Sequence, residues 1–99
     1  MTPEGVVKQA VKERLKVAGA YYHMPVMNGY GAPTLDIIGS HLGRYFAIET
    51  KAPGKKPTPR QEDTIERIRA SGGKVFVIDG DCTELDAWLD VEDIQMKLF

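Results

Sequence analysis

The stretch RYFAIETK, residues 44–51, decides the fold of this chain. It is rich in aromatic and β-branched residues and therefore predicts a strand. Its charged residues Glu49 and Lys51 are two positions apart, so on a strand their side chains share one face, with Cα atoms about 6.6 to 7 Å apart, while Thr50 points the other way. The strand therefore places a carboxylate beside an ammonium group.

A second β-prone segment, residues 34–38, precedes this strand, and the glycines of residues 39–43 predict a turn between them. If Leu42 and Gly43 form the hairpin turn, Asp36 lies directly across from Glu49. Asp36 stands between two apolar residues, where a carboxylate is costly to bury without a partner or a metal ion. A place in a turn or at a sheet edge is the alternative for Asp36.

Two carboxylates on one face, with an ammonium group next to them, suit phosphodiester hydrolysis with a divalent cation. Hard carboxylate oxygens bind Mg²⁺ or Mn²⁺, the metal polarises the phosphate and acidifies a water molecule, and the lysine positions that water or stabilises the developing charge. The alternative for Glu49 and Lys51 is an ordinary ion pair on the surface of a sheet.

Two helices are marked by their ends. A Thr-Pro pair suits the start of each, at residues 2–3 and 58–59, and the first ends at Gly19 and the second at Gly72-Gly73. Apolar residues recur at helical spacing along the first helix: Val7, Val11, Leu15 and Ala18. Its other face carries Lys8, Lys12 and Lys16, for which a solvated surface is the expected role.

The remaining elements complete an α/β pattern. Residues 20–27 are β-prone and lead into the glycine-rich turn 28–31, and residues 74–78 read as a short buried strand. The order of strand, helix and strand predicts a crossover that makes the last strand parallel to its predecessor. Two short helices are expected over residues 83–99, with apolar contacts from Leu85, Trp88, Leu89, Ile94 and Leu98. All 99 residues are expected to form one domain, a central mixed sheet flanked by helices.

Two polar residues extend the apolar faces of the helices. Gln61 precedes Ile65 by four positions and Ile68 by seven, so it points towards the sheet. Glu4 extends the apolar face of the first helix in the same way. The alternative for Gln61 is a buried amide satisfied by the backbone, and for Glu4 a first-turn carboxylate that complements the helix dipole.

The ordered set of these motifs resembles the PD-(D/E)XK nuclease superfamily, and in particular the virus-type replication-repair nuclease (VRR-NUC) family. The resemblance rests on Asp36, the E-x-K of residues 49–51, the K-x-P-G of residues 51–54 and the T-x-x-Q of residues 58–61. The helix, Gly-Gly and apolar strand that follow also match. In that family proline more often stands directly before the aspartate, whereas here Thr34 and Leu35 separate Pro33 from Asp36.

The resemblance implies a restriction-endonuclease-like α/β core and a Mg²⁺- or Mn²⁺-dependent endodeoxyribonuclease. It implies that Asp36 and Glu49 are metal ligands, together with the backbone carbonyl of Thr50. Lys51 becomes the catalytic lysine, Gln61 an orienting group and Glu4 a supporting acid near the metal. Stand-alone members of the family suggest branched DNA, such as Holliday junctions, as the substrate and DNA repair as the setting.

Basic residues close to this site are candidates for phosphate contacts. Lys55, Lys56 and Arg60 follow the catalytic strand directly, so DNA binding is expected of them. The net charge of −1 gives no general indication of a nucleic-acid partner. The roles of Tyr30, His23 and His41 stay open, although an exposed turn is the expected place for His41.

The other expectations come from chain length and composition. A twofold homodimer is expected, because a short core offers little surface for gripping DNA and the C-terminal segment is rich in apolar residues. One cysteine, Cys82, excludes an intramolecular disulfide, so a reducing cytoplasm and a partly buried role for this thiol are expected. A DNA-binding or assembly module that keeps the fold but does not cut is the alternative function. A structural zinc domain is disfavoured, because the Cys and His spacing of such sites is missing.

Overall fold

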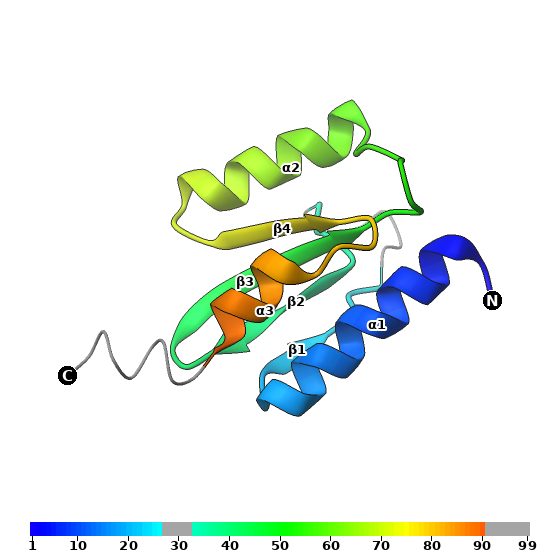
Figure 1. The fold of residues 1–99 in the computed structure, drawn as a ribbon. Coiled ribbons are helices and arrows are strands. Elements are labelled where there is room, and N and C mark those ends of the chain that lie inside the picture. Colours follow the sequence, from blue (N-terminus) through cyan, green and yellow to red (C-terminus); the bar gives the residue numbers. More distant parts are fainter. Residues whose placement is uncertain (27–32, 91–99) are drawn as a thin grey trace.

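The computed structural model describes residues 1–26 and 33–90, and in these residues a four-stranded mixed sheet has the order β1-β2-β3-β4 (Figure 1). The strands are β1 (Tyr21–His23), β2 (Ile37–His41), β3 (Arg44–Thr50) and β4 (Lys74–Ile78). The pairs β1-β2 and β2-β3 are antiparallel, and β3 and β4 are parallel. Helix α2 (Pro59–Ala70) connects the parallel pair, so the predicted crossover and mixed sheet are confirmed.

The hairpin between β2 and β3 has a two-residue turn. The last pair of the ladder is His41 with Arg44, so Leu42 and Gly43 form the turn, with φ of 52° and 81°. Positive φ at both central residues is the turn geometry that matches the twist of paired strands. The turn at residues 42 and 43, one of the registers that the sequence allowed, is the one observed, and it sets the placement of Asp36 and Glu49.

The predicted bounds of the first two strands were wrong. Strand β2 begins at Ile37 and includes residues 39–41, which the sequence had assigned to a turn. The glycine has a packing role there: Gly39 pairs with Tyr22, and a Cβ at this position would collide with the backbone of Tyr21. Glycine therefore lets β1 approach β2 closely. Strand β1 covers three residues of the predicted stretch 20–27.

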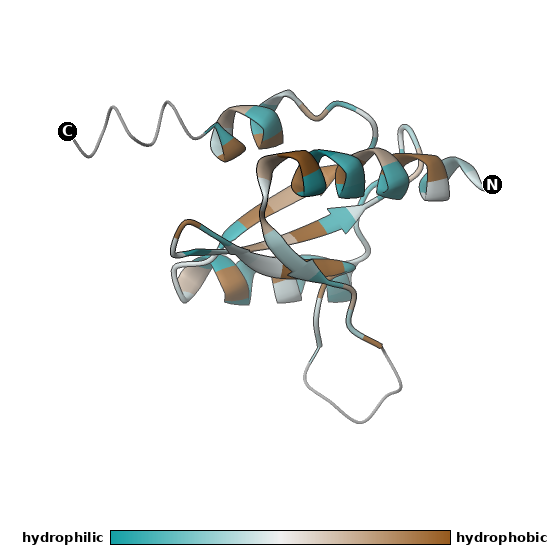
Figure 2. Ribbon diagram, turned by 90° about the horizontal axis from the view of Figure 1, so that it is seen from below, coloured by the Kyte–Doolittle hydropathy of each residue, from teal (hydrophilic) through white to brown (hydrophobic). Residues whose placement is uncertain are grey.

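The helices lie in two layers, one on each face of the sheet (Figure 2). Helices α1 (Pro3–Ala18) and α3 (Thr83–Leu89) pack with Ile37, Phe46 and Ile48 on one face. On the other face α2 contributes Ile65 to a smaller cluster with Leu35, Ala47 and Val75. The side chains of neighbouring β3 residues point to opposite faces of the sheet. Because helices cover both faces, Phe46, Ala47 and Ile48 are all fully buried.

Side-chain caps begin both long helices where the sequence predicts. The Thr2 side chain accepts a hydrogen bond from the Gly5 N–H (3.0 Å), and α1 ends at Gly19 with φ of 76°. Thr58 and Gln61 form a reciprocal capping box at the start of α2. The box fixes the direction in which α2 leaves the end of the sheet.

The far end of the β2-β3 hairpin holds the C-terminus of α3. His41 Nε2 lies 3.1 Å from the Leu89 carbonyl, and Arg44 Nη2 donates to the Trp88 carbonyl at 3.0 Å. The Arg44 guanidinium also lies 4.0 Å from the centre of the Trp88 ring, which packs edge-on against Phe46. The expectation of an exposed His41 was wrong: the side chain is buried because the strand continues past residue 39 and faces α3.

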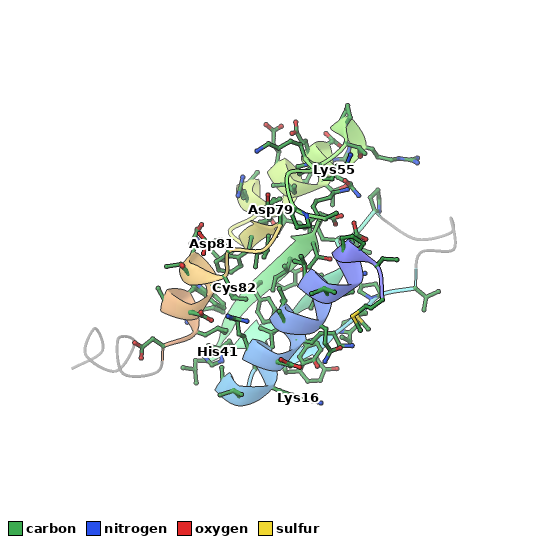
Figure 3. All side chains as sticks on the ribbon, turned by 45° about the vertical axis from the view of Figure 1, so that its right-hand side comes forward. Lys16, His41, Lys55, Asp79, Asp81 and Cys82 are labelled. Atoms are coloured by element: carbon green, nitrogen blue, oxygen red, sulfur yellow. The ribbon has the colours of Figure 1, made fainter. Side chains whose placement is uncertain are left out.

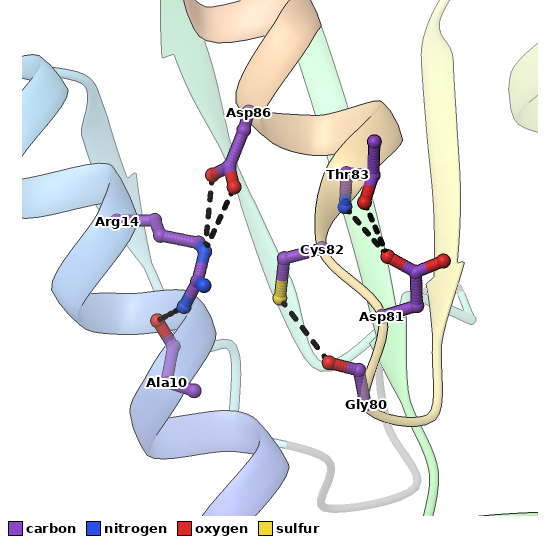
Figure 4. A network of polar contacts seen from close by, with 7 residues as sticks. All are labelled: Ala10, Arg14, Gly80, Asp81, Cys82, Thr83 and Asp86. Atoms are coloured by element: carbon purple, nitrogen blue, oxygen red, sulfur yellow. Dashed lines mark hydrogen bonds and ion pairs between the residues drawn. The ribbon is translucent and has the colours of Figure 1, made fainter.

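Helices α1 and α3 are also joined by a polar contact (Figure 4). Arg14 Nε lies 3.0 Å from Asp86 Oδ1, and this half-exposed ion pair raises the pKa of the Arg14 guanidinium. Beside it Cys82 is buried in the core, as predicted, and burial raises the pKa of its thiol. The predicted helix after residue 83 is confirmed as α3, and the second one lies outside the described residues.

Candidate active site

A cleft of about 600 Å³ opens at the end of the sheet where β3 finishes and α2 begins. Figure 1 shows the N-terminal halves of α1 and α2 at this end, on opposite faces of the sheet. Asp36, Glu49 and Gln61 all line the cleft, so the fold brings together three of the residues that the sequence singled out.

Asp36 is held in place by Thr50. The Oδ2 atom of Asp36 accepts a hydrogen bond from the Thr50 N–H at 3.0 Å and another from Thr50 Oγ1 at 2.8 Å. Thr50 is completely buried, whereas Asp36 is half-buried. The ladder ends with Ile37 paired to Ile48, so Asp36 and Glu49 are the next residues beyond the last pair, and Asp36 itself lies in a bend just before β2. Two donors on one oxygen leave the other oxygen of Asp36 available to a ligand.

Glu49 has partners on α2, on its own strand and in the backbone of Asp36. Its Oε2 atom accepts a hydrogen bond from Gln61 Nε2 at 2.9 Å and lies 3.8 Å from Lys51 Nζ. The carboxylate is 4% exposed and the lysine side chain 13% exposed. The alternative of an ordinary surface ion pair is therefore excluded for these two residues, because both side chains are almost removed from water.

The Glu49 pKa rises to about 7 in this site. Burial is the main cause, and the nearby negative charge of Asp36 raises the pKa further. The ammonium group of Lys51 acts in the opposite direction but does not cancel these effects. Two carboxylates at the base of a cleft thus lack sufficient positive charge, and a divalent cation is a chemical species that would supply it.

Gln61 links the start of α2 to this carboxylate. Its side-chain oxygen accepts a hydrogen bond from the Thr58 N–H at 2.9 Å, and its amide nitrogen donates to Glu49. The capping box therefore fixes the orientation of the amide, because the oxygen is already used by the helix end. The alternative of an amide satisfied by backbone alone is excluded, since one end of Gln61 bonds a site carboxylate.

Glu4 lies at the edge of this group. It occupies the first turn of α1, is half-buried, and its charge adds to the raised pKa of Glu49. Lys8, one turn further along α1, lines the cleft. Its spacing of four from Glu4 places the two side chains on one helix face, so Lys8 lies at the cleft and is half-buried there.

The three predicted DNA contacts divide between two surfaces. Arg60 lines the cleft that contains the carboxylates. Lys55 and Lys56 instead line a neighbouring groove of about 450 Å³, with Glu62, Glu66 and Asp79. Figure 3 labels Lys55 and Asp79 near the start of α2. The Gly54 N–H donates to Asp79 at 3.2 Å, which anchors the turn that carries the two lysines.

Among the residues whose roles the sequence left open, His23 does not line the cleft. His23 is exposed at the end of β1, and Tyr30 lies outside the described residues. Within residues 1–26 and 33–90, no three His, Cys, Asp or Glu side chains form a cluster able to hold a metal. Any metal ion in the cleft would therefore draw on the Asp36–Glu49 pair and backbone or solvent oxygens. In the same part of the chain, no helix is long and apolar enough to cross a membrane.

Sequence reasoning missed two features of the site. The Thr50 hydroxyl was assigned to the opposite face, yet it bonds Asp36, because β2 has not begun at residue 36 and the chain bends there. Met24 and Pro25 also line the cleft. No pattern in the sequence marks these two, since they follow an edge strand and their position depends on how β1 ends.

Comparison with known proteins agrees with this geometry. No family model matches the chain. A relative named "Putative nuclease p44", from Acyrthosiphon pisum secondary endosymbiont phage 1, is 33% identical over 76 residues, which cover 77% of this chain and 81% of that protein. A solved structure described as "VRR_NUC domain" has 29% identity and a TM-score of 0.72, covering 88% of this chain and 94% of its own. With this likeness in sequence and fold, the chain belongs to the VRR-NUC family of nucleases.

Proposed function

We propose that this nuclease is a Mg²⁺- or Mn²⁺-dependent endodeoxyribonuclease of the PD-(D/E)XK type. The observation that carries the proposal is the carboxylate of Glu49, whose pKa is raised by burial and by the nearby charge of Asp36 although Lys51 lies 3.8 Å away. A carboxylate pair of this kind is unfavourable in the folded protein unless it binds a cation or a proton. The pair lies in an accessible cleft, where a phosphodiester can reach it.

The donor set fits a hard divalent cation. Asp36 and Glu49 each offer a carboxylate oxygen, and the carbonyl of Thr50 is the backbone oxygen next to Glu49 in sequence. Mg²⁺ is commonly held by one or two carboxylates while it keeps several waters, so a pair is enough. When bound, such an ion polarises the phosphate and lowers the pKa of a bound water.

The protein groups around the pair have separate tasks. Lys51 Nζ stands 3.8 Å from Glu49, so its charge reaches the place where negative charge develops on the phosphate. Gln61 holds Glu49 in one orientation through its amide, in the way that hydrogen-bonding partners orient metal ligands elsewhere. Glu4 adds a further negative charge near the pair. Arg60 contacts a phosphate from the wall of the cleft, and Lys55 and Lys56 contact the strand further out.

The proposed substrate is branched DNA, such as a four-way junction, and the proposed active form is a twofold homodimer. One such core offers little surface for reading base sequence, so recognition of DNA shape is favoured over a long specific site. A twofold axis would present two clefts to symmetric arms of one junction. Light scattering at micromolar concentration tests the dimer, and a monomeric mass both free and with junction DNA at full activity would refute it.

A non-cleaving DNA-binding module is the second candidate function. Binding DNA without cutting it does not need Lys51 and Gln61 to contact the same oxygen of Glu49, as they do here. Two surfaces with basic residues would suffice for such a module. The contact pattern around Glu49 therefore favours the enzyme.

The experiment is cleavage of linear, nicked, flap and four-way DNA with Mg²⁺, Mn²⁺ or EDTA, by the wild type and by Asp36→Asn. Cleavage is expected with either metal, and none with EDTA. Asn removes a formal charge and a hard ligand with little change of shape, so Asp36→Asn should weaken Mn²⁺ binding, as measured by calorimetry, and abolish cleavage. Metal-independent cleavage, or full activity of Asp36→Asn, would refute the proposal.

A further inference from the structure

One wall of the active-site cleft is apolar. Met24, Pro25 and Pro33 line it, on the side where β1 ends and the chain approaches β2. Met24 remains 45% exposed, although a methionine is normally buried in a core. Asp36 and Glu49 line the same cavity, so an apolar group bound on this wall would share the cleft with the carboxylate pair.

Two cations line the same cleft from opposite layers of the fold. Lys8 belongs to α1, on one face of the sheet, and Arg60 to α2, on the other. Among the described residues neither side chain forms an ion pair, whereas Arg14, Lys51, Arg67 and Lys74 all do. Their charges are therefore available to an anionic ligand that spans the cleft.

The combination matches a nucleotide whose base is unstacked. The volume of about 600 Å³ lies in the range of clefts that take small ligands. A base has an apolar face that can bury itself on Met24, a side chain that adapts its shape and makes favourable sulfur contacts with aromatic rings. In a regular duplex that face is stacked on its neighbours, so only phosphates and sugar edges would reach the wall, where burying charge is costly.

We propose that the cleft binds one unpaired nucleotide of a DNA strand, with its base on the wall of Met24, Pro25 and Pro33 and a flanking phosphate near Lys8 and Arg60. The preferred cutting site is then a phosphodiester next to an unpaired nucleotide. This inference rests on the proposed function and deepens it, because it states what distinguishes a branch or a frayed end from continuous duplex at the level of one cleft.

The test compares three DNA duplexes that differ at one position: fully paired, carrying one unpaired adenine, and carrying an abasic analogue in place of that adenine. Affinity is measured by fluorescence anisotropy in Ca²⁺, and cleavage is measured separately in Mn²⁺. The wild type should bind the unpaired-adenine duplex about fivefold more tightly than the abasic one, which is about 1 kcal/mol and within the range of a methionine sulfur against an aromatic ring. Cleavage should follow the same order and map next to the unpaired position.

Matched variants assign the effect to the wall. Met24→Ser should bring the affinities for the adenine and abasic duplexes to within about twofold of each other. Leu42→Ser also removes an exposed apolar side chain, but at the hairpin turn at the opposite end of β2 and β3, and should keep the wild-type ratio.

A second pair of variants tests the cation. Lys8→Ala should reduce the slope of log affinity against log salt by about 0.7 to 0.9, the value for one lost phosphate contact. Lys16→Ala, two turns further along α1 and exposed (Figure 3), should leave the slope unchanged.

The outcomes separate this inference from the proposed function. Equal affinity of the wild type for the adenine and abasic duplexes overturns the inference, and so does a Met24→Ser variant that keeps the preference. Either result can occur while Mn²⁺-dependent cleavage persists, which leaves the nuclease proposal intact. Conversely, a base-dependent affinity without cleavage of any of the duplexes in Mn²⁺ supports the nucleotide site and contradicts the proposed reaction.

Discussion

The Glu49→Gln variant should be more stable than the wild type in the absence of metal, and by an amount that depends on pH. The Glu49 pKa is about 7 in the folded protein against 4.5 for an unperturbed glutamate, so folding favours the protonated carboxyl. At 1.36 kcal/mol per pKa unit the difference corresponds to at most about 3 kcal/mol. The wild type therefore loses stability as the pH rises from about 4.5 to about 7, and the full loss is present above pH 7.

Glutamine resembles the protonated carboxyl and cannot ionise. Its side-chain oxygen can still accept the hydrogen bond from Gln61 that the glutamate accepts now. At pH 8 in EDTA, Glu49→Gln should exceed the wild type in free energy of unfolding by up to about 3 kcal/mol. For a domain of this size that corresponds to a Tm up to about 14 °C higher. Near pH 4.5 the two proteins should differ little.

Urea titrations at pH 4.5, 6 and 8 measure this difference, with Glu66→Gln as control. Glu66 is exposed on α2, and its replacement should change stability by no more than about 0.5 kcal/mol. Saturating Mn²⁺ should reverse the order of stability at pH 8, since a ligand that binds only the folded wild type stabilises it alone. If Glu49→Gln is no more stable than the wild type at pH 8 in EDTA, the ionised Glu49 carboxylate does not destabilise the metal-free protein, and the reasoning is refuted.

Three further variants test the groups in the cleft and in the groove beside it. Lys51→Ala should lower the cleavage rate at least about a hundredfold, since one preorganised charge contributes about 2.7 kcal/mol or more to stabilising the transition state. An equally large loss of DNA affinity would assign this lysine to binding instead. Lys55→Ala with Lys56→Ala should reduce affinity and its salt dependence, seen by anisotropy, more than the maximal rate; the opposite pattern would place them in the chemistry. Thr50→Val keeps the shape but removes a donor to Asp36, so calorimetry should show roughly tenfold weaker Mn²⁺ binding, and unchanged affinity would show that the backbone N–H suffices.

The sequence predicts the placement of the carboxylates because it contains the turn. Once Leu42 and Gly43 are the two residues of the hairpin, the register puts Glu49 and Asp36 at the same end of the hairpin, each one position beyond the last ladder pair. The ends of the two long helices could also be predicted from the sequence. A threonine cap followed by proline, and a glycine at the end, are signals in the local sequence. These features depend on neighbours in the chain, which a single sequence shows directly.

Features that depend on contacts between distant segments could not be predicted. Gly39 has the character of a turn residue, but it lies inside β2 because β1 approaches it too closely for a side chain. His41 is buried because α3 ends against it, 48 residues further along the chain. The hydroxyl of Thr50 reaches Asp36 only because β2 starts at Ile37, so that Asp36 lies just before the strand. In each case tertiary packing overrides the local preference.

The buried thiol beside the Arg14–Asp86 ion pair gives the molecule an internal reporter. Cys82 is the only cysteine in the sequence, it is 5% exposed, and its raised pKa keeps it as the unreactive thiol. A chromogenic disulfide reagent can therefore label it only when α3 separates from α1, so the labelling rate measures the free energy of that local opening. Because α3 packs on the face of β3 opposite to Gln61, such kinetics with and without Mn²⁺ would show whether occupying the cleft tightens the far layer of the protein.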